Sequence, residues 1–261
     1  MSEPTPVSEP TPVTEDSAAP DPELAIRVDD VHIHYEILNS SRAGLRSRLV
    51  DRNLAGRTTV HAIRGVSFDV AVGEAVGIVG SNGSGKSTIL SAIAGVLPVT
   101  SGQILASAEP RLMGVGAALI PLASGYRNLR LGCLALGMTA DEVDRKIDEL
   151  VEFTELGDAI HRPLNTYSSG MRARVHFAVA TARAPKILLI DEALAVGDRR
   201  FRAKAKTQVE SIIESAGTLL MVNHSLNELS SYCSRGLWLE EGTLLMDGPM
   251  EAVIEAYSAD D

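Results

Sequence analysis

Short apolar runs alternate with segments of helical periodicity along most of this chain. The apolar runs that we expect as strands are residues 24–35, 60–70, 73–80, 187–191 and 218–224. A segment with helical spacing, residues 86–95, follows the third of these runs, and further helical stretches precede the last two. This alternation predicts an α/β fold with a parallel sheet and right-handed crossovers.

A helix is expected to open at Thr139. The sequence Thr-Ala-Asp-Glu places Thr139 at the cap and Glu142 at the third helical position, which is the pattern of a capping box. Apolar residues then recur at helical spacing as far as Phe153. A second amphipathic helix is expected from Arg172 to Arg183.

Residues 1–23 differ from the rest of the chain. They repeat SEPTPV at 2–7 and 8–13, and they hold six of the 12 prolines and six acidic residues without a Lys or Arg. Such a segment cannot bury enough apolar surface to offset its ordering entropy, so a disordered tail is predicted. It would serve either as a solubilising leader or as a docking motif.

Composition and charge exclude several classes. More than half of the formal net charge of −10 lies in the tail, and the mildly acidic remainder argues against nucleic acid as the main partner. Cys133 and Cys233 have no metal-type spacing, so neither a disulfide framework nor a zinc site is expected. The longest nearly apolar stretch, residues 112–123, is too short to cross a bilayer, and the acidic N-terminus is unlike a signal peptide.

The sequence GSNGSGKS at residues 80–87 matches a P-loop between an expected strand and an expected helix. Its glycines let backbone N–H groups curl around phosphates, and the helix N-terminus adds its positive end. Lys86 would reach the β- and γ-phosphates of a bound nucleotide, and the Ser87 hydroxyl would bind Mg²⁺. The nucleotide-binding residues expected here are Gly80, Ser81, Asn82, Gly83, Ser84, Gly85, Lys86, Ser87 and Thr88.

A second chemical element is the run ILLIDE at residues 187–192. A buried strand that ends in Asp191 would place a carboxylate beside the P-loop, where it can hold Mg²⁺ through water. The next residue, Glu192, could orient and deprotonate an attacking water. Alone, the run could be a plain strand followed by an acidic turn, but together with a P-loop it predicts a hydrolase.

The segment YSSGM at residues 167–171 resembles the L-S-G-G-Q signature of ABC-type ATPases. Ser168 and Gly170 match that pattern, whereas Tyr167, Ser169 and Met171 depart from it. The resemblance implies that Ser168, Ser169 and Gly170 bind the γ-phosphate of ATP held by the P-loop of a second subunit. A homodimer with two shared sites is therefore expected.

The same resemblance assigns further roles. Asp198 matches the D-loop that communicates between the two sites, and His224 matches the switch histidine that contacts the γ-phosphate. Tyr35 lies where the family places an aromatic ring on adenine, with His61 as the competing candidate. Val115 stands where most members have the Q-loop glutamine.

Three variant segments, GVGAALIPLASGYRN, YSSGM and DEALAVGD, look like the subgroup of ABC ATPases that export O-antigen, teichoic acid or galactan. That resemblance implies a P-loop core with an antiparallel β flank and a helical subdomain at about residues 112–168. It also implies ATP and Mg²⁺ as cofactors, a separate transmembrane permease that handles a lipid-linked glycan, and a peripheral position on the cytoplasmic face of the membrane. An Arg-rich insertion, residues 41–57, would be either a solvated loop or a contact with permease or lipid headgroups.

Three alternatives are weaker. The first is a soluble ABC ATPase of DNA repair or cluster assembly, and the DNA-repair members would carry long coiled coils or a second cassette. A P-loop GTPase would need an N-K-x-D motif, and the sequence has no Asn-Lys pair. An importer or small-molecule exporter stays open, because the membrane partner fixes the substrate.

Overall fold

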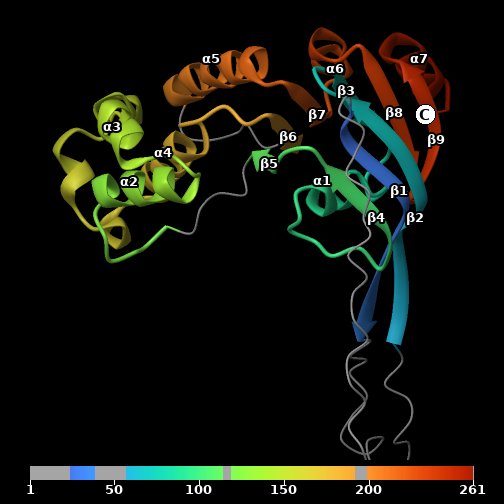
Figure 1. Ribbon diagram of the computed structural model, residues 1–261, viewed down its shortest axis with the longest axis horizontal. Helices are drawn as coiled ribbons and strands as arrows, with labels where there is room; N and C mark the ends of the chain where they lie inside the picture. Colours follow the sequence, from blue (N-terminus) through green and yellow to red (C-terminus); the bar gives the residue numbers. More distant parts are fainter. Residues whose placement is uncertain (1–23, 39–56, 114–118, 192–198, 261) are drawn as a thin grey trace, which may run out of the picture.

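The computed structural model shows two sheets and a separate group of helices (Figure 1). The residues that the structure describes are 24–38, 57–113, 119–191 and 199–260. Within them, no helix combines the length and the apolar character needed to cross a bilayer. The expected tail, residues 1–23, lies outside the described residues.

The first sheet is antiparallel, with the strand order β2-β1-β4. Its strands are β1 (Leu24–Leu38), β2 (Arg57–Ala71) and β4 (Ser101–Ala106). Ile26 and Val28 alternate with the more exposed Arg27 along β1, so one face of the sheet is apolar and buried. This sheet is the antiparallel flank that the resemblance implies.

The second sheet has the order β5-β6-β7-β3-β8-β9. Its strands are β5 (Pro110–Met113), β6 (Ile187–Asp191), β7 (Thr218–Val222), β3 (Ala75–Val79), β8 (Arg235–Glu240) and β9 (Thr243–Pro249). All neighbours are parallel except β9, which runs antiparallel to β8. Every residue of β7 is buried, as expected where both faces of a parallel sheet are covered. The predicted α/β fold is confirmed.

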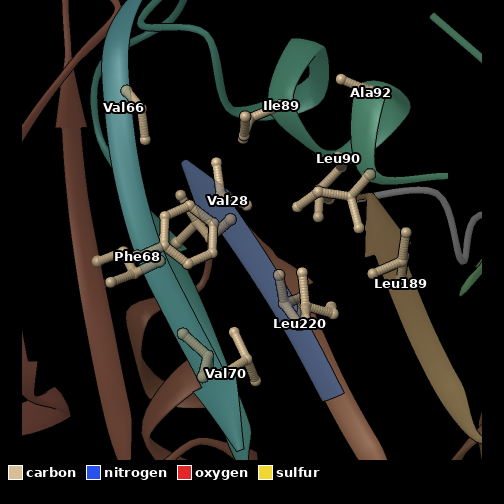
Figure 2. Packing of buried hydrophobic residues seen from close by; sticks show 14 of the residues in the cluster. Val28, Val66, Phe68, Val70, Ile89, Leu90, Ala92, Leu189 and Leu220 are labelled. Atoms are coloured by element: carbon tan, nitrogen blue, oxygen red, sulfur yellow. The ribbon is translucent and has the colours of Figure 1, made fainter. Parts of the chain in front are cut away.

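Helix α1 (Lys86–Ile93) fills the space between the two sheets (Figure 2). Ile89 and Leu90 of α1 belong to one cluster with Phe68 of β2 and with Leu189 and Leu220 of the parallel sheet. Each of these side chains is at most 8% exposed. Their burial fixes the N-terminal end of α1, and with it the P-loop, against both sheets.

The opposite face of the parallel sheet is covered by α5 (Arg199–Ser215), α6 (Leu226–Tyr232) and α7 (Met250–Asp260). Leu188 and Ile190 of β6 face these helices, whereas Leu189 between them faces α1. The alternation of side chains along one strand thus supplies both layers of the core.

The remaining helices form a group with its own core beside the sheets (Figure 1). They are α2 (Gly125–Ala135), α3 (Ala140–Thr154), the short 3₁₀ turns η2 (Gly157–His161) and η3 (Leu164–Thr166), and α4 (Ser169–Ala180). The capping box predicted at Thr139 is present, with Glu142 as its second partner. The boundary expected at about residue 112 falls inside β5, because Leu112 and Met113 pair with β6 of the core sheet.

Candidate nucleotide site

The P-loop leaves the carboxyl end of β3 and enters α1, as expected. Gly80 has a φ of +147°, and a Cβ atom there would lie 1.9 Å from the carbonyl oxygen of Leu239 in β8. The backbone of β8 occupies the space that a side chain at residue 80 would need, so only glycine fits and the loop packs directly on the neighbouring strand. Ser84, later in the loop, is buried.

Lys86 folds back over the loop that it follows. Its Nζ donates hydrogen bonds to the carbonyl oxygens of Gly80 and Ser81, each at 2.7 Å. Burial lowers the pKa of Lys86, while the carboxylates of Glu240 and Asp191 oppose that shift. The ammonium group is therefore held at the mouth of the loop, where a phosphate oxygen can bind it.

Ser87 and Asp191 meet although 104 residues separate them in the sequence. The Ser87 hydroxyl donates a hydrogen bond of 3.1 Å to Asp191 Oδ1. This pair of oxygen groups fits Mg²⁺, which is usually held by one or two carboxylates together with phosphates and waters. Among the described residues there is no group of three or more His, Cys, Asp or Glu side chains that could hold a metal ion.

The carboxyl ends of three parallel strands lie side by side at this edge of the sheet. Val222 of β7 pairs with both Ile78 of β3 and Asp191 of β6. His224 follows Val222 by two residues, just as Gly80 follows Ile78, and it is exposed. The predicted switch histidine therefore leaves the sheet at the edge that also carries the P-loop and Asp191.

The signature segment lies in the helical group. Ser168 is the N-cap of α4 and its Oγ accepts a hydrogen bond from the Met171 N–H at 3.2 Å. Because Ser168 caps the helix, α4 spans Ser169–Ala180, so the expected start at Arg172 and end at Arg183 are wrong by three residues each. Ser168 and Ser169 are exposed, and Gly170 is half-buried.

Tyr167 fixes the signature segment to the core of the helical group. Its side chain is buried, and its hydroxyl donates a hydrogen bond of 2.6 Å to the Ala159 carbonyl oxygen. Burial raises the pKa of Tyr167. Arg172 donates to the Tyr167 carbonyl oxygen at 2.7 Å, so both the side chain and the backbone of Tyr167 are tied down.

The two candidates for the adenine contact lie on adjacent strands. Tyr35 pairs with Val60, and His61 pairs with His34, whose ring lies 5.7 Å away between centroids. Tyr35 is 39% exposed, which leaves its ring free to take a ligand. The assignment of Tyr35 over His61 stays a prediction.

Several predicted residues lie outside the described part of the chain. They are Glu192, Asp198, Val115 and all of the Arg-rich insertion except Arg57, which begins β2. Their assigned roles stay predictions.

Sequence reasoning missed the contact of a distant carboxylate with the P-loop. Glu240, at the end of β8, accepts a hydrogen bond from the Ser81 N–H at 3.0 Å. The two residues are 159 positions apart, and no local pattern around Glu240 distinguishes it from an ordinary exposed acid.

The chain was compared with known proteins. The model of the ABC transporter family matches residues 63–195, which is half of the chain. The teichoic acids export ATP-binding protein TagH of Enterococcus faecalis is 42% identical over 77% of this chain, but the match covers 45% of that relative. TagH of Staphylococcus haemolyticus is 32% identical, with 90% of this chain and 88% of the relative covered. The chain spans between 36% and 65% of the length of the first six curated relatives.

Solved structures share the fold. The ATP-binding subunit of an ABC transporter superposes with a TM-score of 0.66 at 21% identity, covering 90% of this chain and 93% of its own. An ATP-binding cassette solved as a dimer with ADP and phosphate gives a TM-score of 0.63 at 21% identity, covering 86% of this chain and 98% of its own. The P-loop core, the antiparallel flank and the helical group are thus a known arrangement.

Proposed function

The chain belongs to the ABC transporter family, and from that membership we propose that it is the ATP-hydrolysing subunit of an exporter for a lipid-linked polysaccharide. The observation that carries the ATPase part is the convergence of Lys86, Ser87 and Asp191 at one edge of the sheet. The polysaccharide is proposed because relatives named for teichoic acid export match at 31–42% identity, one of them over 88% of its length.

Each chain supplies the binding half of a site for ATP. Backbone N–H groups of the P-loop and the start of α1 would hold the phosphates, and Lys86 would neutralise the β- and γ-phosphate oxygens. Ser87 and Asp191 would hold Mg²⁺, which supplies charge neutralisation on the transferred phosphoryl group. Glu192 would take the proton of the attacking water, and His224 would contact the γ-phosphate.

The other half of the site comes from a second copy. Ser168, Ser169 and Gly170 stand at the N-terminus of α4, in a helical group that has its own core. We assign them to the γ-phosphate on the partner's P-loop, with Asp198 between the two sites. In this arrangement two copies close on two ATP molecules and reopen after hydrolysis, while bound to a separate permease on the cytoplasmic face of the membrane.

Glu192→Gln tests the hydrolytic step. The amide cannot accept the proton of the water, whereas Lys86, Ser87 and Asp191 still hold ATP and Mg²⁺, so ATP binding is kept and an ATP-dependent dimer accumulates. Hydrolysis falls below about a tenth of the wild-type rate. Glu241→Gln, which removes the same charge from an exposed turn, is the matched control and leaves the rate unchanged. A Glu192→Gln rate above that tenth would remove Glu192 from the role of base.

The substrate is tested in cells. Depletion of the chain should accumulate lipid-linked glycan on the cytoplasmic side, and wild-type protein but not Glu192→Gln should restore export. Normal glycan export in depleted cells would assign the chain to another ABC transporter.

A further inference from the structure

The turn between β8 and β9 holds the P-loop through two separate points. Glu240 accepts the Ser81 N–H at Oε2, at 3.0 Å, and accepts the Ser81 hydroxyl at Oε1. Two residues later, the Gly242 N–H donates to the Ser84 carbonyl oxygen at 2.9 Å. Two points of the loop, Ser81 and Ser84, are therefore tied to one turn.

The turn is itself fixed from the other side. The Arg64 N–H in β2 donates to the Gly242 carbonyl oxygen at 2.8 Å. Gly242 has a φ of +79°, and a Cβ atom there would lie 2.6 Å from the Ala62 carbonyl oxygen. The antiparallel sheet thus supports the turn, and the turn supports the P-loop.

A carboxylate at this place is unexpected on electrostatic grounds, because the loop is built to bind a polyanion. Partial burial alone would raise the pKa of Glu240, but the hydrogen bonds from Ser81 and the charge of Lys86 lower it, so the carboxylate is ionised at neutral pH. A negative group here repels phosphate unless its contact with the loop contributes more than the repulsion costs.

We propose that Glu240 is a positioning residue for nucleotide binding: by holding both donors of Ser81, it keeps the P-loop in its phosphate-binding shape before ATP arrives. The inference rests on the proposed ATPase function and adds to it a residue outside the family's sequence motifs. Since the loop is pre-shaped, less ordering has to accompany binding, and the affinity for nucleotide rises. The effect falls on binding rather than on the chemical step.

The test measures the dissociation constant of a non-hydrolysable ATP analogue with Mg²⁺ for the full chain by calorimetry. Glu240→Gln removes the charge and leaves one acceptor for two donors, whereas Ser81→Ala removes one donor without changing any charge. The matched control is Glu241→Gln, because Glu241 is an exposed acid of the same turn. ATPase rates supply KM and kcat for each variant.

We expect Glu240→Gln and Ser81→Ala each to raise the dissociation constant about five- to tenfold, which lies within the range of the net contribution of one hydrogen bond. The double variant should bind within about twofold of the weaker single one, since both changes remove the same contact. KM should rise in parallel while kcat stays within about twofold of wild type. Glu241→Gln should bind the analogue as tightly as wild type or slightly more tightly.

The opposite results overturn the proposal. Tighter binding by Glu240→Gln would mean that repulsion outweighs positioning. If Glu240→Gln binds the analogue as tightly as wild type but melts at a lower temperature, Glu240 has a structural role only. If Glu240→Gln fails to fold, the affinity of Ser81→Ala for the analogue tests the proposal instead. If the wild-type chain does not bind the analogue, the proposed ATPase function fails as well; if wild type binds and the variants match it, only the role of Glu240 fails.

Discussion

The two regions assigned to ATP are built in opposite ways. The P-loop is enclosed by its own chain: β8 lies against Gly80, the β8–β9 turn holds Ser81 and Ser84, and Asp191 meets Ser87. The signature segment is exposed, and among the described residues the Ser168 side chain bonds within its own helix turn. The first region is a binding site shaped within one molecule, and the second is a surface that a nucleotide on another molecule can complete.

An aromatic cluster joins the helical group to α5. Phe153 of α3 and Phe177 of α4 lie near Phe201 of α5, with ring centroids 5.5–5.8 Å apart. Lys204 of α5 lies 4.7 Å from the ring centroid of Phe153, and Arg174 of α4 lies 4.9 Å from that of Phe201. These ring and cation–π contacts connect the signature helix to the first helix after residues 192–198, which carry Glu192 and Asp198.

A pair of glycine substitutions should give the largest difference between the enclosed P-loop and the exposed signature segment. Gly80→Ala places a methyl group 1.9 Å from the Leu239 carbonyl oxygen, so it should cost about 3 kcal/mol or more of unfolding free energy and abolish ATP binding. Gly170→Ala, whose Cβ meets only Ser168 Oγ at 4.0 Å, should change stability by less than about 1 kcal/mol. Denaturant titration of both variants checks this, and equal losses of stability would contradict the contrast.

Ser168→Arg tests whether the exposed half serves another molecule. A long cation at the N-terminus of α4 should obstruct closure and lower ATP hydrolysis about 100-fold, the loss typical of a missing donor to transition-state charge. Binding of ATP to the same chain's P-loop should stay within about twofold, because the Ser168 hydroxyl bonds to Met171 in its own helix turn and, among the described residues, not to that loop.

The control for that variant is Ser168→Thr, which keeps a hydroxyl cap for α4. A mixture of Ser168→Arg chains with Lys86→Ala chains tests whether the P-loop of one chain and the signature segment of the other form one ATP site. In a mixed dimer one shared site loses both functions and the other keeps both, so partial activity is expected. A loss of ATP binding in Ser168→Arg alone would show that the segment acts on its own chain's nucleotide.

Sequence predicted the P-loop side better than its surroundings. The segments 187–191 and 218–224 are short continuous apolar runs, and buried parallel strands have that pattern, so β6 and β7 were predictable. Strand β4 was not predicted, since Gly102 and Gln103 are exposed and interrupt any apolar pattern. The bond of Ser81 to Glu240 depends on the pairing of β3 with β8, which no local window encodes.

Within the helical side, Tyr167→Phe should have a smaller effect. The change removes the hydroxyl donor of a buried side chain and leaves the Ala159 carbonyl oxygen without that partner, at a cost of about 1–2 kcal/mol. Thermal unfolding of the full chain measures it. Since Tyr167 anchors the signature segment, ATP affinity should be unchanged while hydrolysis falls by less than about tenfold. A weaker affinity for ATP would mean that the two regions are not independent.

Thr139→Ala should have the smallest effect, because Thr139 lies at the exposed start of α3. It removes the cap oxygen that accepts the Glu142 N–H at 3.3 Å, so stability should fall by about 1 kcal/mol with no change in ATPase rate. Thr139→Ser, which keeps the hydroxyl, is the control and should match wild type.

The same capping box predicts how the stability difference between wild type and Thr139→Ala varies with pH. Two hydrogen bonds from Thr139 lower the pKa of Glu142 from its usual value of 4.5. The bond from the Thr139 backbone has the larger effect, and the bond from its side chain has the smaller. A carboxyl whose pKa is lower in the folded state stabilises the fold above its unfolded value and loses that contribution as pH falls through the folded value. The stability gap between wild type and Thr139→Ala should therefore be full at neutral pH and shrink below pH 4.5. A gap that stays constant in acid would show that the Thr139 hydroxyl caps α3 without the Glu142 carboxylate.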